Sequence, residues 1–322
     1  MKQILPLSIG IDVSKDKVDV AVLFADKTSL SKTFANTEVG ICELGNLLKM
    51  QKTADTVPCV LESTGDYHLL SALMLTQEGY MVNCINPLIT KKYQRSSVRN
   101  AKTDAVDALR LAQIGIMEPD MPVFTASKPV LASRKLVSSL AKMQQMKQQL
   151  SSHVKQLRQA QSMLGEDLDF SLYDTLLETY DKQIKSLQKQ IGKSIPEHIS
   201  EFTKNTRGVS ANQMAILSCM LADKTFTNRD QLVAFIGLDV MPRSSGTWQG
   251  KGKISKRGNA YLRKILYQIA WGLKVHNPHF KEYYLRLRIE QKKHYTTCLI
   301  AVARKFLRYY YATVLQETYA TS

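Results

Sequence analysis

The order of apolar segments in the first third of the chain most limits its possible folds. Three apolar stretches separated by short polar turns, PLSIGIDVS, KVDVAVLFA and SLSKTFA, predict a meander of three strands within residues 6–35. A helical pattern follows an Asn36/Thr37 cap. Two further strand-like segments, VPCVLES and YMVNCINP, stand on either side of the helical segment DYHLLSALMLTQEG. A last helix, TDAVDALRLAQIG, ends near residue 116.

Three antiparallel strands followed by helix, strand, helix and strand is the order of the ribonuclease-H-like α/β fold. In that fold the first and fourth strands are neighbours at the centre of the sheet. Asp12 ends the first strand and Glu62 ends the fourth, so we expect these two carboxylates side by side. Asp104 and Asp107 come later at a spacing of three, which places both on one face of a helix.

Four carboxylates gathered in one place repel each other unless cations lie between them. Hard oxygen ligands and incomplete protein coordination favour Mg2+, or Mn2+, with room for the phosphate oxygens of a phosphoryl-transfer reaction. Each residue also has a purely structural interpretation: Asp12 as a strand-end turn residue, Glu62 as a strand end, and Asp104 and Asp107 as an acidic helix start. The GID segment also occurs in actin-like ATPases, but no further Gly-rich phosphate loops follow it.

Charge is unevenly distributed along the 322 residues. Residues 1–120 hold 13 Lys/Arg and 14 Asp/Glu, whereas residues 121–322 hold 31 and 14, an excess of 17 positive charges. Such asymmetry indicates a polyanionic partner, nucleic acid above all, with an ordinary basic surface as the alternative. Neither a membrane-spanning run nor a signal-peptide pattern is found, so we expect a cytoplasmic protein without a membrane partner.

Composition also divides the chain into domains. Residues 130–192 are rich in Leu, Lys, Gln and Ser with near-heptad apolar spacing, which predicts long helices broken around MLGEDLDFS. Either a solvated antiparallel pair or a dimerising coiled coil fits this pattern. Beyond residue 195, mainly helical patterns are interrupted by a Gly/Ser/Lys loop, MPRSSGTWQGKGKISKRGN. We therefore predict a catalytic domain (1–120), a helical, coiled-coil connector (121–194) and a mainly α C-terminal domain (195–322).

Cations and glycines in the last domain indicate where nucleic acid binds. TRGVSANQMAIL resembles a helix-hairpin-helix turn, in which Arg207 and Gly208 contact a phosphate, although a plain helix turn fits equally well. KGKISKRGNAYLRK gathers cations beside the free amides of a helix start, which favours contact with a nucleic-acid backbone. The cations of this basic cluster are Lys251, Lys253, Lys256, Arg257, Arg263 and Lys264. In the tyrosine run 309–311, at least two side chains are expected in the core rather than stacked on bases.

The segments IGIDVSK, LESTG, INP and KTDAVDA resemble the motifs of the DEDD transposases of the IS110 insertion-sequence family, which includes bridge-RNA-guided recombinases and Piv-type DNA invertases. FIGLDV, SSG and GKISKRGNAYLRKILY resemble the C-terminal transposase domain of that family. The resemblance implies a magnesium site like that of the Holliday-junction resolvase RuvC, formed by Asp12, Glu62, Asp104 and Asp107. It also implies a serine that becomes covalently joined to DNA, here Ser245, with Ser244 as the alternative.

The function implied by this resemblance is that of a mobile-element transposase that cuts and exchanges strands of donor and target DNA. The resemblance further implies a structured non-coding guide RNA and a homo-oligomer, a dimer of dimers. Three alternatives remain at this point: a Piv-type site-specific invertase, a RuvC-like junction-resolving nuclease, and a nonenzymatic protein that binds nucleic acid.

Overall fold

The computed structural model describes residues 4–63, 65–94, 104–118, 120–165, 167–245 and 248–316. The chain divides into two compact units, Met1–Lys128 and Pro129–Ser322, and each is described by itself. In the described part of the chain, no helix is both long enough and apolar enough to cross a membrane.

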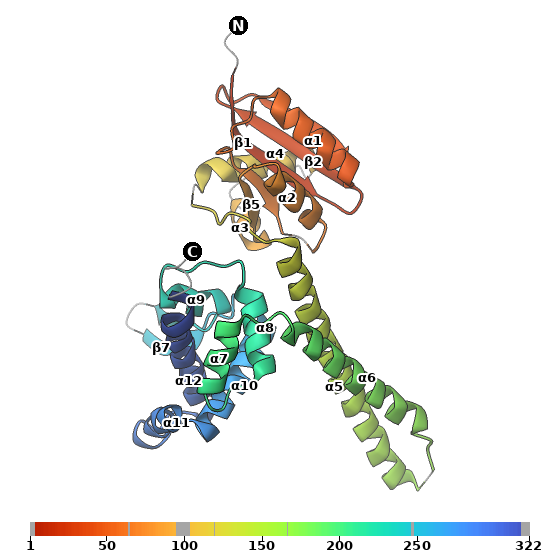
Figure 1. Cartoon of the computed structure of the whole chain (residues 1–322), viewed down its shortest axis with the longest axis vertical. Coiled ribbons are helices and arrows are strands. Elements are labelled where there is room, and N and C mark those ends of the chain that lie inside the picture. The colour runs from red at the N-terminus through yellow and green to blue at the C-terminus, as the bar shows by residue number, and fades with distance from the viewer. Residues whose placement is uncertain are drawn as a thin grey trace. The chain divides into compact units, whose positions relative to one another are not determined.

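A five-stranded sheet forms the centre of the first unit, with the strand order β3-β2-β1-β4-β5 (Figure 1). β1 (Pro6–Val13), β2 (Lys17–Phe24) and β3 (Ser29–Ala35) are antiparallel neighbours, as the three apolar stretches predict. β4 (Cys59–Glu62) and β5 (Val82–Ile85) continue the sheet in parallel with β1. The first and fourth strands are therefore neighbours at the middle of the sheet.

Helices cover both faces of this sheet. α1 (Glu38–Met50) and α2 (His68–Gln77) bury apolar side chains against one face, and α4 (Asp104–Met117) packs on the other. Side chains alternate between faces along a strand, so β1 contributes Ile9 and Ile11 to the core beneath α1 and α2. The unit is thus a mixed α/β structure in which β1 is buried on both sides.

Local signals explain where the helices of the first unit begin. The Thr37 hydroxyl accepts a hydrogen bond from the Gly40 amide at 3.2 Å and caps α1, as the Asn36/Thr37 pattern predicts. A further helix, α3 (Pro87–Gln94), is missing from the sequence-based prediction. Its eight residues give little periodicity, although proline in the first turn is a helix-start signal.

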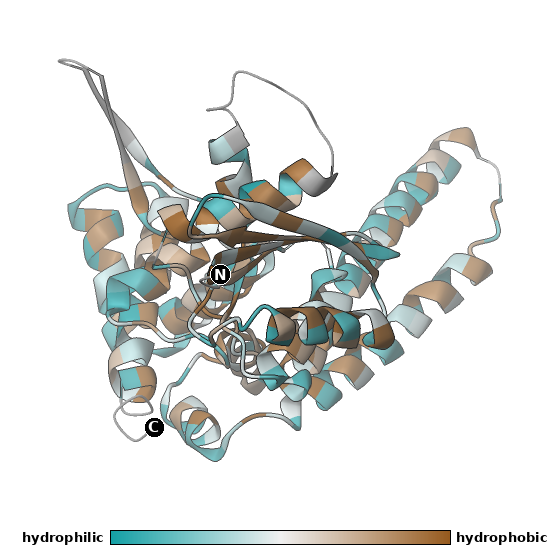
Figure 2. Ribbon diagram, turned by 90° about the horizontal axis from the view of Figure 1, so that it is seen from above, coloured by the Kyte–Doolittle hydropathy of each residue, from teal (hydrophilic) through white to brown (hydrophobic). Residues whose placement is uncertain are grey.

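Two long helices begin the second unit, α5 (Lys128–Leu164) and α6 (Ser171–Gly192) (Figure 1). They are joined by two salt bridges with N···O distances of 2.6 and 2.7 Å, Lys147–Asp181 and Arg158–Asp174. Figure 2 shows hydrophilic and hydrophobic residues alternating along both helices, which is typical of helices with one face in water. The antiparallel pair within one chain is thus present, and a coiled coil between chains stays a prediction.

The remaining helices of the second unit pack around one apolar core, to which all of them contribute buried side chains. They are α7 (Glu197–Asn205), α8 (Ala211–Leu221), α9 (Arg229–Ile236), α10 (Ala260–His276), α11 (Pro278–Leu285) and α12 (Tyr295–Tyr310). Short π-helical turns, Arg286–Glu290 and Tyr311–Leu315, follow α11 and α12. The mainly helical character of this part is therefore as predicted.

A β-hairpin interrupts these helices, formed by β6 (Val240–Ser245) and β7 (Trp248–Ile254). The sequence predicts a loop here, and that prediction is wrong. The Gly, Ser and Lys residues of the segment do not give the alternation of apolar and polar residues that marks a half-buried strand. The hairpin is built by main-chain pairing, from Val240 with Ile254 to Ser245 with Trp248, which needs no such pattern.

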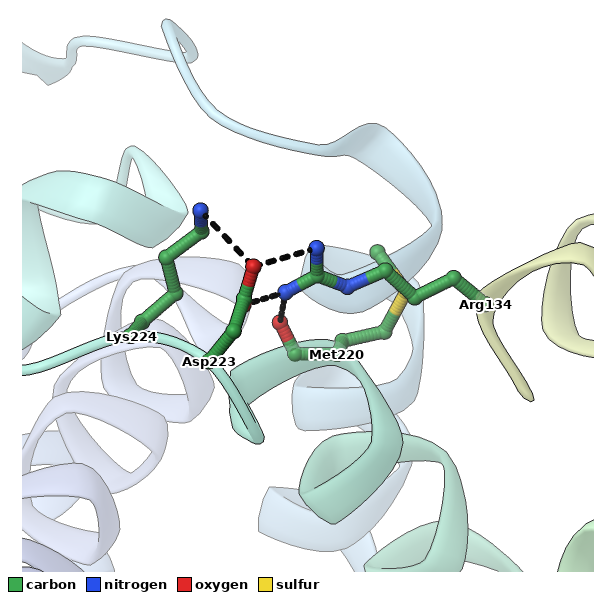
Figure 3. A network of polar contacts seen from close by, with 4 residues as sticks. All are labelled: Arg134, Met220, Asp223 and Lys224. Carbon is green, nitrogen blue, oxygen red and sulfur yellow. Dashed lines mark hydrogen bonds and ion pairs between the residues drawn. The ribbon is translucent and has the colours of Figure 1, made fainter. Parts of the chain in front are cut away.

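A buried ion pair joins α5 to the end of α8 (Figure 3). The Arg134 guanidinium contacts both carboxylate oxygens of Asp223 and donates a hydrogen bond to the Met220 carbonyl at 3.3 Å. Lys224 adds a second cation, 3.3 Å from Asp223 Oδ2. Only 4% of the Asp223 side chain is exposed, and burial lowers the pKa of Arg134. Burial removes the water that would otherwise stabilise the charges of Arg134 and Asp223, so each charge depends on the other for its stabilisation.

Candidate active site

Two residues of the predicted site, Asp12 and Glu62, stand on neighbouring strands. β1 and β4 run parallel with Ile11 beside Leu61, so Asp12 and Glu62 occupy the next position along the two strands. Neighbours in register point to the same face of a sheet. The main chain therefore places these residues side by side at the carboxyl ends of their strands.

α4 covers that face of the sheet, and a glycine allows it to come close. Gly10 lies two residues before Asp12 and hence on the same face of β1. A Cβ atom at Gly10 would lie 1.8 Å from the Ala108 carbonyl oxygen and 2.4 Å from Ala112 N. Because these are main-chain atoms, a side chain here would push the helix away.

The direction of α4 determines which of its residues lie beside Asp12. A Cβ atom on Gly115 would lie 2.2 Å from Ser8 Oγ, so the later part of the helix covers the earlier part of the strand. Two strand residues span about 6.6 Å, the rise of between four and five helical residues. Continuing along the strand to Asp12 therefore leads to the first turn of α4, which contains Asp104 and Asp107.

Glu62 and Asp107 have polar partners in the described part of the structure. The Thr90 hydroxyl donates a hydrogen bond to Glu62 Oε2 at 2.6 Å, and Arg110 Nη1 lies 2.6 Å from Asp107 Oδ1. The Asp104 side chain lies outside the described part of the structure. Among the side chains that are described, no three His, Cys, Asp or Glu residues are grouped closely enough to hold a metal ion. Convergence of all four carboxylates on one ion stays a prediction.

The donors at the ends of β1 and β4 nevertheless suit a hard divalent cation. Asp12 and Glu62 are both half-buried and offer carboxylate oxygens, one of which the Thr90 hydroxyl orients. Mg2+ prefers oxygen ligands, usually keeps several waters and is commonly bound through one or two carboxylates. The residues present therefore fit magnesium held between Asp12 and Glu62, with the first turn of α4 alongside.

A fifth carboxylate, Asp19, belongs to the same face and is missed by the sequence analysis. Asp19 on β2 is registered opposite Asp12, so both side chains point to the same side of the sheet. It is largely buried, accepts a hydrogen bond from the Thr33 hydroxyl at 2.5 Å and lies 3.1 Å from Lys17 Nζ. The short turn between β1 and β2, which fixes the register, is the sequence signal that pairs the two aspartates.

The two candidate serines, Ser244 and Ser245, end β6 near the tip of the hairpin. Ser245 is registered opposite Trp248, the first residue of β7. The side chains of both serines lie outside the described residues, as does Gly246. The hairpin places both at one strand end, and the choice between them stays a prediction.

The predicted basic cluster lies on β7, in the segment that leads into α10, and at the start of α10 itself. Four of its side chains are exposed, those of Lys253, Lys256, Arg257 and Lys264, and the Lys251 side chain falls outside the described part. Arg263 differs, because its Nη1 donates hydrogen bonds to the carbonyls of Gly258 at 2.6 Å and Ile236 at 3.1 Å. Arg263 therefore fixes the turn before α10, and contact of the cluster with nucleic acid stays a prediction.

The turn between α7 and α8 contains the other predicted contacts, Arg207 and Gly208. Arg207 is exposed, and Ser210 caps α8 through reciprocal hydrogen bonds with Gln213. Gly208 has a φ of +94°, and a Cβ atom there would lie 2.5 Å from the Gly272 carbonyl oxygen on α10. Packing against α10 is sufficient reason for this glycine, so it does not by itself indicate phosphate binding.

The tyrosine run at the end of α12 divides between core and surface. Tyr310 is buried, and the half-buried Tyr311 donates a hydrogen bond to the Phe226 carbonyl at 3.1 Å. The prediction that at least two of the three belong to the core is thus confirmed. Tyr309 remains 44% exposed.

Known proteins match both parts of the chain. Residues 9–163 match a family of DEDD transposases of the IS110 type, and residues 201–285 match the transposase family IS116/IS110/IS902. A Streptomyces coelicolor protein named insertion element IS110 uncharacterized 43.6 kDa protein is 27% identical over 143 residues. This similarity covers 44% of the chain and 35% of that relative, so the chain matches about a third of the relative's length. The first family match includes β1, β4 and α4, and the second includes the hairpin and the basic cluster.

Proposed function

The chain belongs to the IS110 family of transposases, and from this premise we propose that it is a mobile-element transposase that cuts and exchanges DNA strands. One observation carries the proposal: Asp12 and Glu62 lie in register on neighbouring strands, with the first turn of α4 beside them. We assign the first unit to the ribonuclease-H-like, RuvC-like fold, an assignment that the strand order β3-β2-β1-β4-β5 supports.

The chain has three functional parts in this proposal. Residues 1–120 form the catalytic domain, residues 121–194 the helical connector, and residues 195–322 the C-terminal domain that binds nucleic acid. The exposed cations of β7 and of the start of α10 support the last assignment. Donor and target DNA, a structured guide RNA and a dimer of dimers are the partners that we infer from the family.

A magnesium or manganese ion, when bound, polarises the phosphate and lowers the pKa of the attacking hydroxyl. Asp12 and Glu62 hold the ion in this proposal, and Asp104 and Asp107 complete the set of carboxylates. The Thr90 hydroxyl keeps one Glu62 oxygen oriented. Asp19 forms an ion pair with Lys17 and accepts a hydrogen bond from Thr33, and these contacts limit the repulsion between Asp19 and the neighbouring Asp12. Lysines and arginines of the second unit hold the strand backbone.

The attacking group that we propose is the hydroxyl of Ser245, with Ser244 as the alternative. Its oxygen forms a bond to phosphorus while a P–O bond of the DNA strand breaks, and the serine proton passes to a base or to solvent. The resulting phosphoserine ester conserves the energy of the cut bond, so a second strand hydroxyl can displace the serine without ATP. The carboxylates and the serines belong to different units, which makes assembly of the complex a condition for cutting.

Strand exchange in the presence of magnesium tests the proposed function. The full chain, co-expressed with the sequences that flank it, is expected to produce rejoined DNA junctions, and a chelator is expected to abolish them. Junctions at the ends of a short element indicate a transposase, whereas reversal of an internal segment indicates an invertase. Cut DNA that is never rejoined would point to the junction-resolving nuclease, and binding without cutting to a nonenzymatic protein.

A covalent intermediate with serine is the second expected result. On a nicked DNA substrate that cannot complete rejoining, the protein should become joined to DNA through Ser245. Digestion followed by mass spectrometry locates the modified peptide, and the Ser194→Ala variant, which removes an exposed serine elsewhere, serves as the control. Modification of Ser244 would correct the assignment, and normal exchange by a Ser244→Ala/Ser245→Ala double variant would eliminate the serine mechanism.

A further inference from the structure

The second unit contains a cavity of about 570 Å³ that the proposed reaction does not use. It is formed by the end of α7, the starts of α9 and α11, and α12. The lining residues that matter here are Thr206, Arg229, His279, Lys305, Arg308 and Tyr309. Cavities of several hundred cubic ångströms are typical of small-molecule sites, so this one has room for a nucleotide.

The lining carries more positive than negative charge. Arg308 is paired with Asp230, at 2.8 Å, and this hydrogen bond lowers the pKa of Asp230. Arg229 and Lys305 add two further cations, and no carboxylate is among the described residues that line the cavity. Burial and the nearby Arg286 both lower the pKa of Lys305. The cavity is therefore suited to an anion such as a phosphate.

A buried hydroxyl in the lining lacks a partner. Thr206 is 3% exposed, and its Oγ1 atom has no hydrogen-bond partner among the described residues. A buried polar group without a hydrogen bond is unfavourable, so such a group usually meets a water molecule or a ligand. The Oγ1 atom itself is almost fully covered by the protein, so the Thr206 side chain has to rotate before a ligand in the cavity can reach it.

An exposed aromatic ring forms another part of the lining. The Tyr309 ring lies 5.6 Å from the Phe202 ring and 6.3 Å from the Phe280 ring, measured between centroids. These contacts fix its orientation, while 44% of the residue stays exposed. A rigid, accessible ring beside cations is the arrangement on which bases of single-stranded nucleic acid stack.

A smaller cavity of about 110 Å³ adjoins the first, because His279 and Lys305 line both. It adds Arg286, together with Tyr283 and Glu282, and the Arg286 guanidinium lies 5.4 Å from the Tyr283 ring. Arg286 is thus a further cation beside the first cavity, and it can bind the phosphate of a neighbouring nucleotide. This continuity favours a strand over a free nucleotide.

We propose that this cavity holds one unpaired nucleotide of a DNA or RNA strand. The base stacks on Tyr309, and Arg229 and Lys305 bind its phosphate. The inference rests on the proposed function, because it takes nucleic acid as the substrate, but it uses neither the carboxylates of the first unit nor the hairpin serines.

Photochemical crosslinking of the full-length protein tests this directly. Single strands of DNA and of RNA, each carrying iodouracil at one position, are irradiated in complex with the protein, and the attached peptide is identified by mass spectrometry. We expect attachment at Tyr309, and comparison of the two strands shows whether DNA, RNA or both enter the cavity. Attachment only at other residues, with both strands bound, would overturn the proposal.

Variants measured by fluorescence anisotropy separate stacking from charge. Tyr309→Leu should weaken binding of the single strand roughly tenfold, whereas Tyr309→Phe, which keeps the ring, should bind as the wild type does. The control is Phe235→Leu, which removes an exposed ring that does not line the cavity. Equal binding by the Tyr309→Leu and wild-type proteins would contradict the stacking role.

Arg229→Gln leaves the aromatic packing intact and tests the phosphate contact. It should lower the slope of log affinity against log salt by about 0.7 for a single strand. Lys281→Gln removes an exposed cation of α11 outside both cavities and should leave the slope unchanged. An unchanged slope in Arg229→Gln would overturn the phosphate assignment. Wild-type protein that binds no nucleic acid at all would instead defeat the proposed function.

Discussion

Replacing Asp12 with alanine is expected to lower strand exchange at least about a thousandfold, while nucleic-acid binding stays within about twofold of the wild type. The reason is that Asp12 supplies a carboxylate to the proposed metal position, whereas binding depends mainly on the cations of the second unit. Removal of Asp12 also removes its repulsion of Asp19, directly opposite on β2, which offsets part of the stability lost with the other contacts of Asp12.

Three measurements on the same protein check this first prediction. Strand exchange is followed by gel electrophoresis with magnesium and with manganese, binding by anisotropy, and stability by thermal unfolding. The matched control is Asp16→Ala, which removes an exposed carboxylate from the turn between β1 and β2. Full exchange by Asp12→Ala, or equal losses in the Asp12→Ala and Asp16→Ala proteins, would refute the assigned site.

Replacing Asp223 with alanine is expected to destabilise the second unit by about 3–5 kcal/mol, because the change leaves the partly buried Arg134 without its counter-charge. Urea unfolding followed by intrinsic fluorescence measures this well. The only two tryptophans of the chain, Trp248 and Trp271, both belong to residues 129–322, so their emission reports on that unit alone.

An exposed ion pair between α5 and α6 provides the comparison for this second prediction. Asp174 pairs with Arg158 while both side chains are about half exposed, so Asp174→Ala should cost no more than about 1 kcal/mol. An Arg134→Met/Asp223→Ala double variant should lose less than the sum of the two single losses, because neither charge is then left buried alone. Equal losses for Asp223→Ala and Asp174→Ala would show that burial of the Arg134 pair does not contribute to stability.

The sheet of the first unit is largely predictable from the sequence, because a local pattern of residues marks each of its strands. Alternating apolar residues mark β1 and β2, and the Thr37 cap marks the start of α1. The strand order then follows from the sequence of elements. The sequence analysis misses Asp19 because this residue comes next to Asp12 only through the pairing of β1 with β2. The helical and strand periodicities of 3.6 and 2 residues do not describe such pairing between strands.

Residues of the second unit were harder to interpret from sequence. Arg263 and Gly208 are predicted phosphate contacts, and the structure gives each a further role: Arg263 fixes the turn before α10, and Gly208 allows close packing on α10. A cation or a glycine can have either role or both, and the sequence alone does not show its tertiary contacts. The cavity at Tyr309 was unpredictable for the same reason, since its lining comes from segments about a hundred residues apart.

The contact of Gly10 with α4 also bears on how such a chain can evolve. The separation of strand and helix at this point depends on the missing side chain at residue 10 and on two small, fully buried residues of the helix, Ala108 and Ala112. Sequence drift at the exposed positions of α4 can therefore alter its surface while the offset between Asp12 and the helix start persists. A substitution at position 10 is not tolerated in this way, because any side chain there pushes α4 away from β1. Asp104 and Asp107 would then move away from Asp12 and Glu62. Inheritance of the proposed carboxylate arrangement thus depends strongly on a strand residue that contributes no side chain to it.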